Sequence, residues 1–162
     1  MQKELVTAIS NLLATESVKR TIAGLKGKLE KSDEPYVWNV FKTEPLGIKL
    51  PKEIKSTWIF VLKKDRHSIL HYHPNSTQHT VVIEGRGRIK IGNVCKVLRL
   101  FDLTERSIYV IDKNIPHEFY PEAEDMVVLS YHTCLSNDLM EIRCDSGAKR
   151  RYKNYGNDKE AG

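Results

Sequence analysis

Short runs of strand-forming residues fill the chain from Tyr36 onward and constrain its fold more than any other feature. These runs are rich in β-branched and aromatic residues, and Pro, Gly, Asn and Asp separate them. No helix-period segment of useful length lies between them, which predicts an antiparallel sandwich or barrel instead of a parallel sheet. The candidate strands are YVWNVFK, GIKL, STWIFVLK, SILHYH, QHTVVIEG, GRIKIG, CKVLRLF, SIYVID, HEFYP and DMVVLSYHT.

Residues 3–31 differ from this pattern because their apolar residues recur at helical spacing. They form two sets that are out of step with each other: Leu5, Ile9, Leu12 and Leu13, then Val18, Ile22, Leu25 and Leu29. Thr15 or Ser17, between the sets, could cap a second helix. We therefore expect one irregular helix or two short ones, which cap the barrel or join a dimer interface.

The length of 162 residues suits one domain with a sizeable core, and 40% hydrophobic content is too high for a disordered chain. We expect a helical segment at 1–34, a barrel at 35–146 and a disordered basic tail at 147–162. That tail carries five basic and two acidic residues, so it supplies much of the net charge of +5. The remaining body is only mildly basic, which argues against a specific nucleic-acid partner.

The cysteines and the N-terminus predict a cytoplasmic protein. The three cysteines, Cys95, Cys134 and Cys144, are odd in number and fit no zinc spacing, so reduced thiols are expected. The N-terminus lacks the apolar core of a signal peptide, and no run of about 18 apolar residues predicts a membrane helix.

His71 and His73 are the first candidate site residues. Residues two apart on a strand point to the same face, so the two imidazoles project side by side. Histidine is the commonest protein ligand of borderline transition metals, and such a pair is half of a metal site. Two surface histidines are the alternative. The alternation of neighbouring residues does not decide between them, because neither face of SILHYH is plainly solvent-like.

Two further residues complete a candidate ligand set. The turn-forming string PNST follows His73, and Gln78 opens the next strand. A hairpin of this length brings Gln78 back beside the histidine pair, with its amide oxygen as a possible ligand. His117 begins a short strand after a tight turn and adds a donor from a distant part of the chain.

With these residues the sequence resembles the cupin family. The stretch HYHPNSTQHTVVIEG matches the first cupin motif at His71, His73, the spacing to residue 78, and Gly85, and DKNIPH matches the second at its histidine. The resemblance spans roughly residues 55–135. It implies a jelly-roll β-barrel with an internal pocket that often holds one divalent metal ion.

Three departures from the family pattern bear on the site. Asp65 and Asn114 stand where the motifs have Gly, and Asn tolerates the left-handed conformation that Gly supplies. Gln78 replaces the usual Glu. A neutral amide leaves the ion its full +2 charge, which favours Lewis-acid chemistry and Fe(II), Zn(II), Ni(II) or Cu(II) over Mn(II). Alternatively, Gln78 is not a ligand and hydrogen-bonds a substrate.

The resemblance implies a small metalloenzyme that acts on a small organic molecule, in the manner of cupin dioxygenases. One alternative is a sugar or nucleotide-sugar isomerase or epimerase, because His-x-His, four residues and Gln are similar to its motif as well. Such enzymes use histidine as a base without a metal, so a third converging imidazole at His117 would count against this alternative. The other alternative is a non-catalytic ligand-binding or sensor cupin. We expect a homodimer with no membrane partner.

His132 is the candidate general acid or base. His132 lies on the same face of its strand as Val128, Ser130 and Cys134. If this face of the strand lines the pocket, the imidazole of His132 reaches the pocket. A satisfied buried histidine is the alternative. Parity places His79 on the outer face and outside the site, and His67 is expected at the rim.

Overall fold

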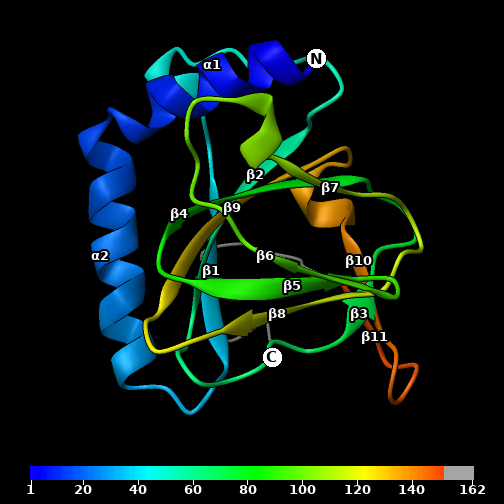
Figure 1. The fold of residues 1–162 in the computed structure, drawn as a ribbon. Coiled ribbons are helices and arrows are strands. Elements are labelled where there is room, and N and C mark those ends of the chain that lie inside the picture. Colours follow the sequence, from blue (N-terminus) through cyan, green and yellow to red (C-terminus); the bar gives the residue numbers. More distant parts are fainter. Residues whose placement is uncertain (152–162) are drawn as a thin grey trace.

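The computed structural model describes residues 1–151, which form two α-helices and eleven β-strands (Figure 1). The expected all-β fold with N-terminal helices is confirmed. The helices are α1 (Gln2–Leu13) and α2 (Glu16–Glu30). The strands are β1 (Tyr36–Phe41), β2 (Ser56–Leu62), β3 (His71–Tyr72), β4 (Gln78–Glu84), β5 (Gly87–Ile91), β6 (Val94–Val97), β7 (Tyr109–Ile111), β8 (His117–Pro121), β9 (Met126–His132), β10 (Met140–Arg143) and β11 (Lys149–Arg151).

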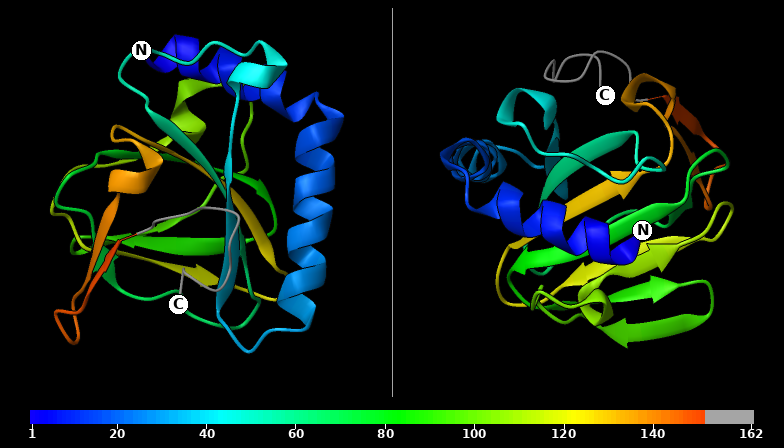
Figure 2. Two further views of the ribbon diagram at one scale, coloured as in Figure 1. Left: turned by 180° about the vertical axis from the view of Figure 1, so that it is seen from behind. Right: turned by 90° about the horizontal axis from the view of Figure 1, so that it is seen from above.

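The strands form two sheets that face each other (Figure 2). One sheet has the order β1-β2-β9-β4-β7 and the other β11-β10-β3-β8-β5-β6. Neighbouring strands in both sheets run antiparallel. Consecutive strands often belong to different sheets, so residues distant in the sequence come together between them.

The N-terminal segment forms two helices, with the break where the two apolar sets fall out of step. The Thr15 side chain accepts a hydrogen bond from the backbone N–H of Val18 and so caps α2. Both helices bury their apolar stripes against the outer face of the five-stranded sheet. They therefore cap one side of the barrel.

Alternation on β9 separates the helix-covered face of the sheet from its inner face. Leu129 and Tyr131 pack under the helices, whereas Val128, Ser130 and His132 line an internal cavity. The same alternation on β4 sends Gln78 inward and His79 outward. The outer face at His79 is not open to solvent, because α1 covers it: the ring is 4% exposed and its Nδ1 lies 3.4 Å from Gln2 Nε2.

The family glycine positions keep their backbone conformation despite substitution. Asp65 has φ 55° and Asn114 has φ 66°, so both occupy the left-handed region. Gly85, which matches the family, has φ 87°, and a Cβ there would lie 2.4 Å from the backbone oxygen of Asp125. The tight turn between β4 and β5 thus requires glycine for two reasons.

Some expected elements differ from the structure. GIKL is not a strand, because Gly47 at φ 68° ends a 3-10 helix at Glu44–Leu46 and Pro51 follows shortly after. SILHYH contributes only the two residues of β3. Residues 135–147, which follow the last candidate strand, contain a 3-10 helix at Ser136–Asp138 and then β10.

The expected tail at 147–162 begins within the sheet, because β11 pairs with β10. Residues 152–162 lie outside the described part, so the expectation of disorder there stays a prediction, as do the domain boundaries. Over residues 1–151, neither helix has the length and apolar content that crossing a membrane requires.

Candidate metal centre

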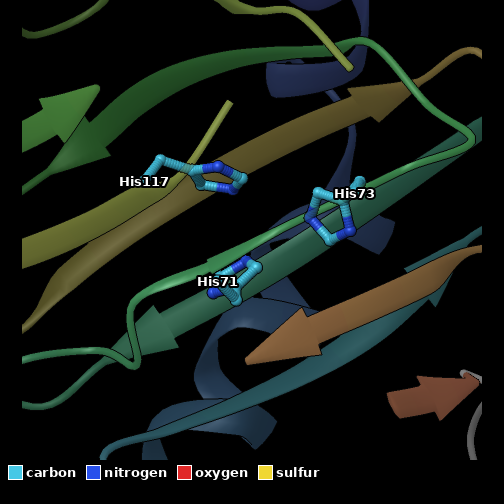
Figure 3. A group of neighbouring side chains, drawn as sticks. All are labelled: His71, His73 and His117. Carbon is cyan, nitrogen blue, oxygen red and sulfur yellow. The ribbon is translucent and has the colours of Figure 1, made fainter. Parts of the chain in front are cut away.

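His71, His73 and His117 come together on the inner face of the six-stranded sheet (Figure 3). His71 and His117 are direct cross-strand partners in the β3–β8 pair, so their side chains leave the sheet on the same face. His73 follows His71 by two residues and shares that face. One nitrogen from each ring lies within 4.8 Å of the other two, which is close enough for one ion to bind all three.

Each of these rings is held through Nδ1 by a backbone carbonyl. The acceptors are Ile69 O at 2.5 Å from His71, Met140 O at 2.8 Å from His73, and Ile115 O at 3.0 Å from His117. A carbonyl oxygen can only accept, so Nδ1 carries the hydrogen in every ring. The lone pair is therefore on Nε2, and the three rings are fixed in the tautomer that binds a metal through Nε2.

Burial keeps these imidazoles in the neutral form that metals require. Burial and the neighbouring His73 ring lower the pKa of His71 to about 3. Burial, followed by the two neighbouring rings, lowers the pKa of His117 well below its ordinary value. The Nε2 atom of His117 is buried and has no hydrogen-bond partner among the described residues. These residues fit a divalent metal ion, which would satisfy that nitrogen.

Gln78 reaches the same cavity from the opposite sheet. It is 4% exposed, and its Nε2 donates to Ser130 Oγ at 3.2 Å. Burial lowers the pKa of His73, and hydrogen bonds with Met140 and Gln78 partly offset this lowering. The structure therefore brings Gln78 beside the histidine cluster, as the hairpin spacing predicts, while its role as a ligand stays a prediction.

His132 also faces the cavity. It is the cross-strand partner of Gln78, and its ring centroid lies 5.1 Å from that of His73. Its Nδ1 lies 2.9 Å from the hydroxyl of Ser76. Burial, followed by the nearby histidines, lowers its pKa well below the ordinary value. Parity placed His132 on the same face as Val128 and Ser130, and the structure shows that this face lines the cavity. The catalytic role of His132 stays a prediction.

Glu141 is the site residue that the sequence analysis missed. It lies on β10, is 1% exposed, and places Oε1 at 3.5 Å from His71 Nε2. The available signal was a carboxylate between Met140 and Ile142, in a segment that follows the last candidate strand. A charged residue flanked by apolar ones on a short strand can face inward only where polar groups receive it.

The cavity between the sheets is small, with a volume of about 30 Å³. The four histidines, Gln78, Ser130 and Glu141 line its polar part, and its apolar walls come from Tyr36, Phe60, Leu62, Phe119, Val128 and Leu139. His67 lies outside, as expected: its side chain is 70% exposed and packs against Tyr120.

Comparison with known proteins agrees with this architecture. Residues 58–132 match the family model of the cupin domain. No curated protein matches the chain.

Three solved structures are similar in fold. A candidate sugar phosphate isomerase from Acidithiobacillus ferrooxidans has a TM-score of 0.50 at 13% identity, over 69% of this chain and 67% of that one. Oxalate decarboxylase from Lactobacillus farciminis has 0.53 at 14% identity, over 70% and 32%. The coconut allergen cocosin has 0.53 at 16% identity, over 69% and 29%.

The matched part of this chain spans about a third of the decarboxylase and of the allergen. At such low identity these likenesses establish the fold and leave the chemistry open. The family-model match and the shared double-sheet architecture agree with the two histidine motifs. Residues 58–132 of the chain therefore form a cupin domain.

Proposed function

We propose that this protein is a mononuclear metalloenzyme, dioxygenase-like, that acts on a small organic substrate. His71, His73 and His117 hold the ion, and Gln78 faces it from the opposite sheet. The observation that carries this proposal is the convergence of three buried imidazoles whose Nδ1 atoms are all bonded to backbone carbonyls. Three buried lone pairs that point at one place are explained most simply by a cation that binds there.

A divalent ion bound there would polarise a substrate oxygen and, if it is iron, supply the electron transfer that reactions of dioxygen need. The chain contributes position and environment. The neutral imidazoles and the neutral Gln78 amide leave the ion's charge available to the substrate. The apolar walls exclude water, which strengthens electrostatic interactions inside the cavity.

The cavity size supports a small substrate. A volume of about 30 Å³ holds roughly two water molecules, whereas ligand pockets for drug-sized molecules measure roughly 300–1,000 Å³. A nucleotide sugar would need a much larger space and many polar partners. The third converging imidazole, His117, is also superfluous for metal-free base catalysis. Both observations favour the metalloenzyme over the isomerase alternative.

His132 is the proposed acid or base. It reaches the cavity from the sheet opposite His71, and its Nδ1 bonds a hydroxyl that can either donate or accept. Such a ring can take a proton on one nitrogen and release one from the other. This role is separate from holding the ion.

Cytoplasmic location and a homodimer are also part of the proposal. The three cysteines are all free, which suits a reducing compartment. Val94 and Val97 on the edge strand β6 are 54% and 77% exposed, and a second copy would cover them. Sedimentation velocity at several concentrations would measure the oligomeric state.

The test is elemental analysis of protein purified without an affinity tag or chelator, followed by oxygen uptake with a panel of small organic acids, diketones and thiols. The double variant His71→Ala/His117→Ala removes two ligands, and His67→Ala is the matched control outside the cavity. We expect about one ion per chain in wild type and control, none in the double variant, and metal-dependent oxygen uptake with at least one compound. Equal metal content in wild type and double variant would contradict the site.

A further inference from the structure

Arg143, at the end of β10, places a positive charge beside the candidate metal centre. β10 pairs antiparallel with β3 (Figure 1), and Arg143 is the direct cross-strand partner of His71. Such partners leave a sheet on the same face, with Cβ atoms roughly 5 Å apart. Glu141, two residues earlier on β10, lines the cavity, so alternation also directs Arg143 to the inner face. Register and alternation therefore agree that the side chains of Arg143 and His71 are neighbours.

The guanidinium of Arg143 is available to a ligand. Among residues 1–151, no side chain forms an ion pair or a hydrogen bond with it. The residue is partly buried, yet none of its nitrogens is among the buried atoms that lack a partner, so these nitrogens still reach solvent. A partly desolvated cation without a carboxylate is well suited to bind an anion that arrives from outside.

The charges around the cavity favour an anion at this position. A divalent ion on the three histidines would add positive charge close to Arg143, whose own charge already acts on the His71 ring. Among the described residues that line the cavity, Glu141 alone is acidic, and it faces a second guanidinium, that of Arg150, across the β10–β11 pair. The metal-loaded centre would therefore carry more positive than negative charge, and an anionic ligand would reduce this excess.

The shape of the position narrows the class of anion. A guanidinium is planar and binds a carboxylate through two parallel hydrogen bonds. The cavity beside it has a volume of about 30 Å³ and apolar walls, whereas pockets for drug-sized molecules measure roughly 300–1,000 Å³. A short organic acid fits this combination of a planar cation and a small apolar space.

We propose that Arg143 binds the carboxylate of the substrate at the rim of the cavity, so that the substrate is a small organic acid held between this guanidinium and the ion. This inference rests on the proposed metal centre and narrows its substrate from any small organic molecule to a carboxylate. The guanidinium then decides which end of the substrate meets the ion. The alternative is that Arg143 is an ordinary surface cation, and binding would then be independent of it.

The experiment compares a carboxylate with its neutral amide. Zn(II)-loaded wild type, Arg143→Gln and Arg143→Lys are titrated with acetate and with acetamide by calorimetry, and circular dichroism checks folding. We expect the preference for acetate over acetamide to fall roughly tenfold or more in Arg143→Gln, because a charge-assisted hydrogen bond is lost. Zn(II) content should stay at the wild-type level. Arg143→Lys keeps the charge without the planar fork, so its preference should lie between the other two.

Arg88→Gln is the matched control. Arg88 is exposed, and it pairs with Tyr120 on the outer face of the same sheet, so its loss changes the net charge equally. This variant should keep the wild-type preference for acetate. An unchanged preference in Arg143→Gln would overturn the inference. An equal fall in Arg88→Gln and Arg143→Gln would also overturn it, because net charge alone would then explain the effect.

A crystal structure of the Zn(II)-loaded wild type with acetate decides the matter even if a variant does not fold. We expect carboxylate oxygens at about 2.7–2.9 Å from the guanidinium nitrogens of Arg143. Zinc on the three histidines without acetate at Arg143 would overturn this inference and leave the metal centre standing. No ion on the histidines would overturn the proposed function itself.

Discussion

The two walls of the cavity use histidine in two different ways. On the six-stranded sheet, His71, His73 and His117 direct Nδ1 at backbone carbonyls. On the five-stranded sheet, His132 directs Nδ1 at the hydroxyl of Ser76. All four rings lie in one small cavity, and burial lowers the pKa of each of them.

The difference is in the partner. A carbonyl fixes the tautomer because it can only accept, whereas a hydroxyl can turn and serve either tautomer. A metal ligand needs a lone pair that stays in place, and a proton carrier needs a ring that can exchange. The hydrogen-bond partner of Nδ1 therefore distinguishes the expected metal ligands from the expected proton carrier, although all four residues are buried histidines.

The largest expected effect is on the metal-binding wall. His73→Ala removes one of three converging donors, so metal affinity should fall by more than the roughly 100-fold that loss of an outer-shell partner causes. The fold should survive, because the flanking strands remain paired. Metal content after dialysis, with His67→Ala as control, measures this. Stoichiometric metal in His73→Ala would show that the two walls do not differ as described.

Low pH should destabilise the metal-free protein through the imidazoles of both walls. Burial lowers the pKa of all four imidazoles, so below pH 6.5 the unfolded chain binds protons that the folded protein does not. The free energy of unfolding of the metal-free protein should therefore decrease as pH falls from 6.5. The slope is up to about 1.4 kcal/mol per pH unit for each imidazole.

This loss should continue for His71 toward pH 3, where its lowered pKa lies. Urea unfolding at several pH values measures it, and His132→Phe should have a slope shallower by one proton. A free energy of unfolding that is constant between pH 7 and 5 would contradict burial of neutral rings on both walls.

Substitution of His132 on the five-stranded sheet should lower turnover and leave metal binding almost intact. His132→Gln removes the proposed acid or base, so turnover of a substrate found by oxygen uptake should fall about 100-fold. Metal affinity should change less than tenfold, because the three-histidine wall is untouched. The measurements are steady-state kinetics across pH and metal titration. Parallel loss of metal and turnover would make His132 part of the ion's binding site instead.

The last prediction concerns the turn that joins the two walls and lies farthest from the chemistry of the site. Gly85 lies between β4 of one sheet and β5 of the other, and Gly85→Ala combines a positive φ with an overlap at Asp125 O. We expect a loss of about 2–5 kcal/mol in the free energy of unfolding. Gly47→Ala is the matched control, because Gly47 has a similar φ of 68° and open space, so about 1–2 kcal/mol is expected there. Equal losses would mean that the close contact at Gly85 relaxes freely.

Local patterns predicted much of the fold and part of the site. The hairpin length brought Gln78 beside the histidine pair, strand alternation placed His132 on the same face as Ser130, and the His-x-His spacing placed His71 and His73 on one face. These predictions succeeded because a strand has a fixed period of two, whatever surrounds it. The apolar sets of the N-terminal segment lose step beside Thr15, which left one irregular helix and two short helices open, and the structure has two helices.

Other features depended on which strands pair and on what covers them. Glu141 escaped prediction because β10 is short and takes its role from pairing with β3, about 70 residues earlier in the sequence. His79 was placed correctly on the outer face, but only the packing of α1 shows that this face is buried.

The sequence by itself determined the strand periodicity, the side-chain faces and the candidate donors, because these follow from local backbone geometry and side-chain chemistry. The tertiary structure decided which donors meet. The cross-strand register brings His117 opposite His71, and strand order places Glu141 beside the same ring. Backbone carbonyls then set the tautomers. The donor side chains meet because strand pairing aligns segments that are distant in the sequence. The local periodicity of a single strand does not determine that alignment.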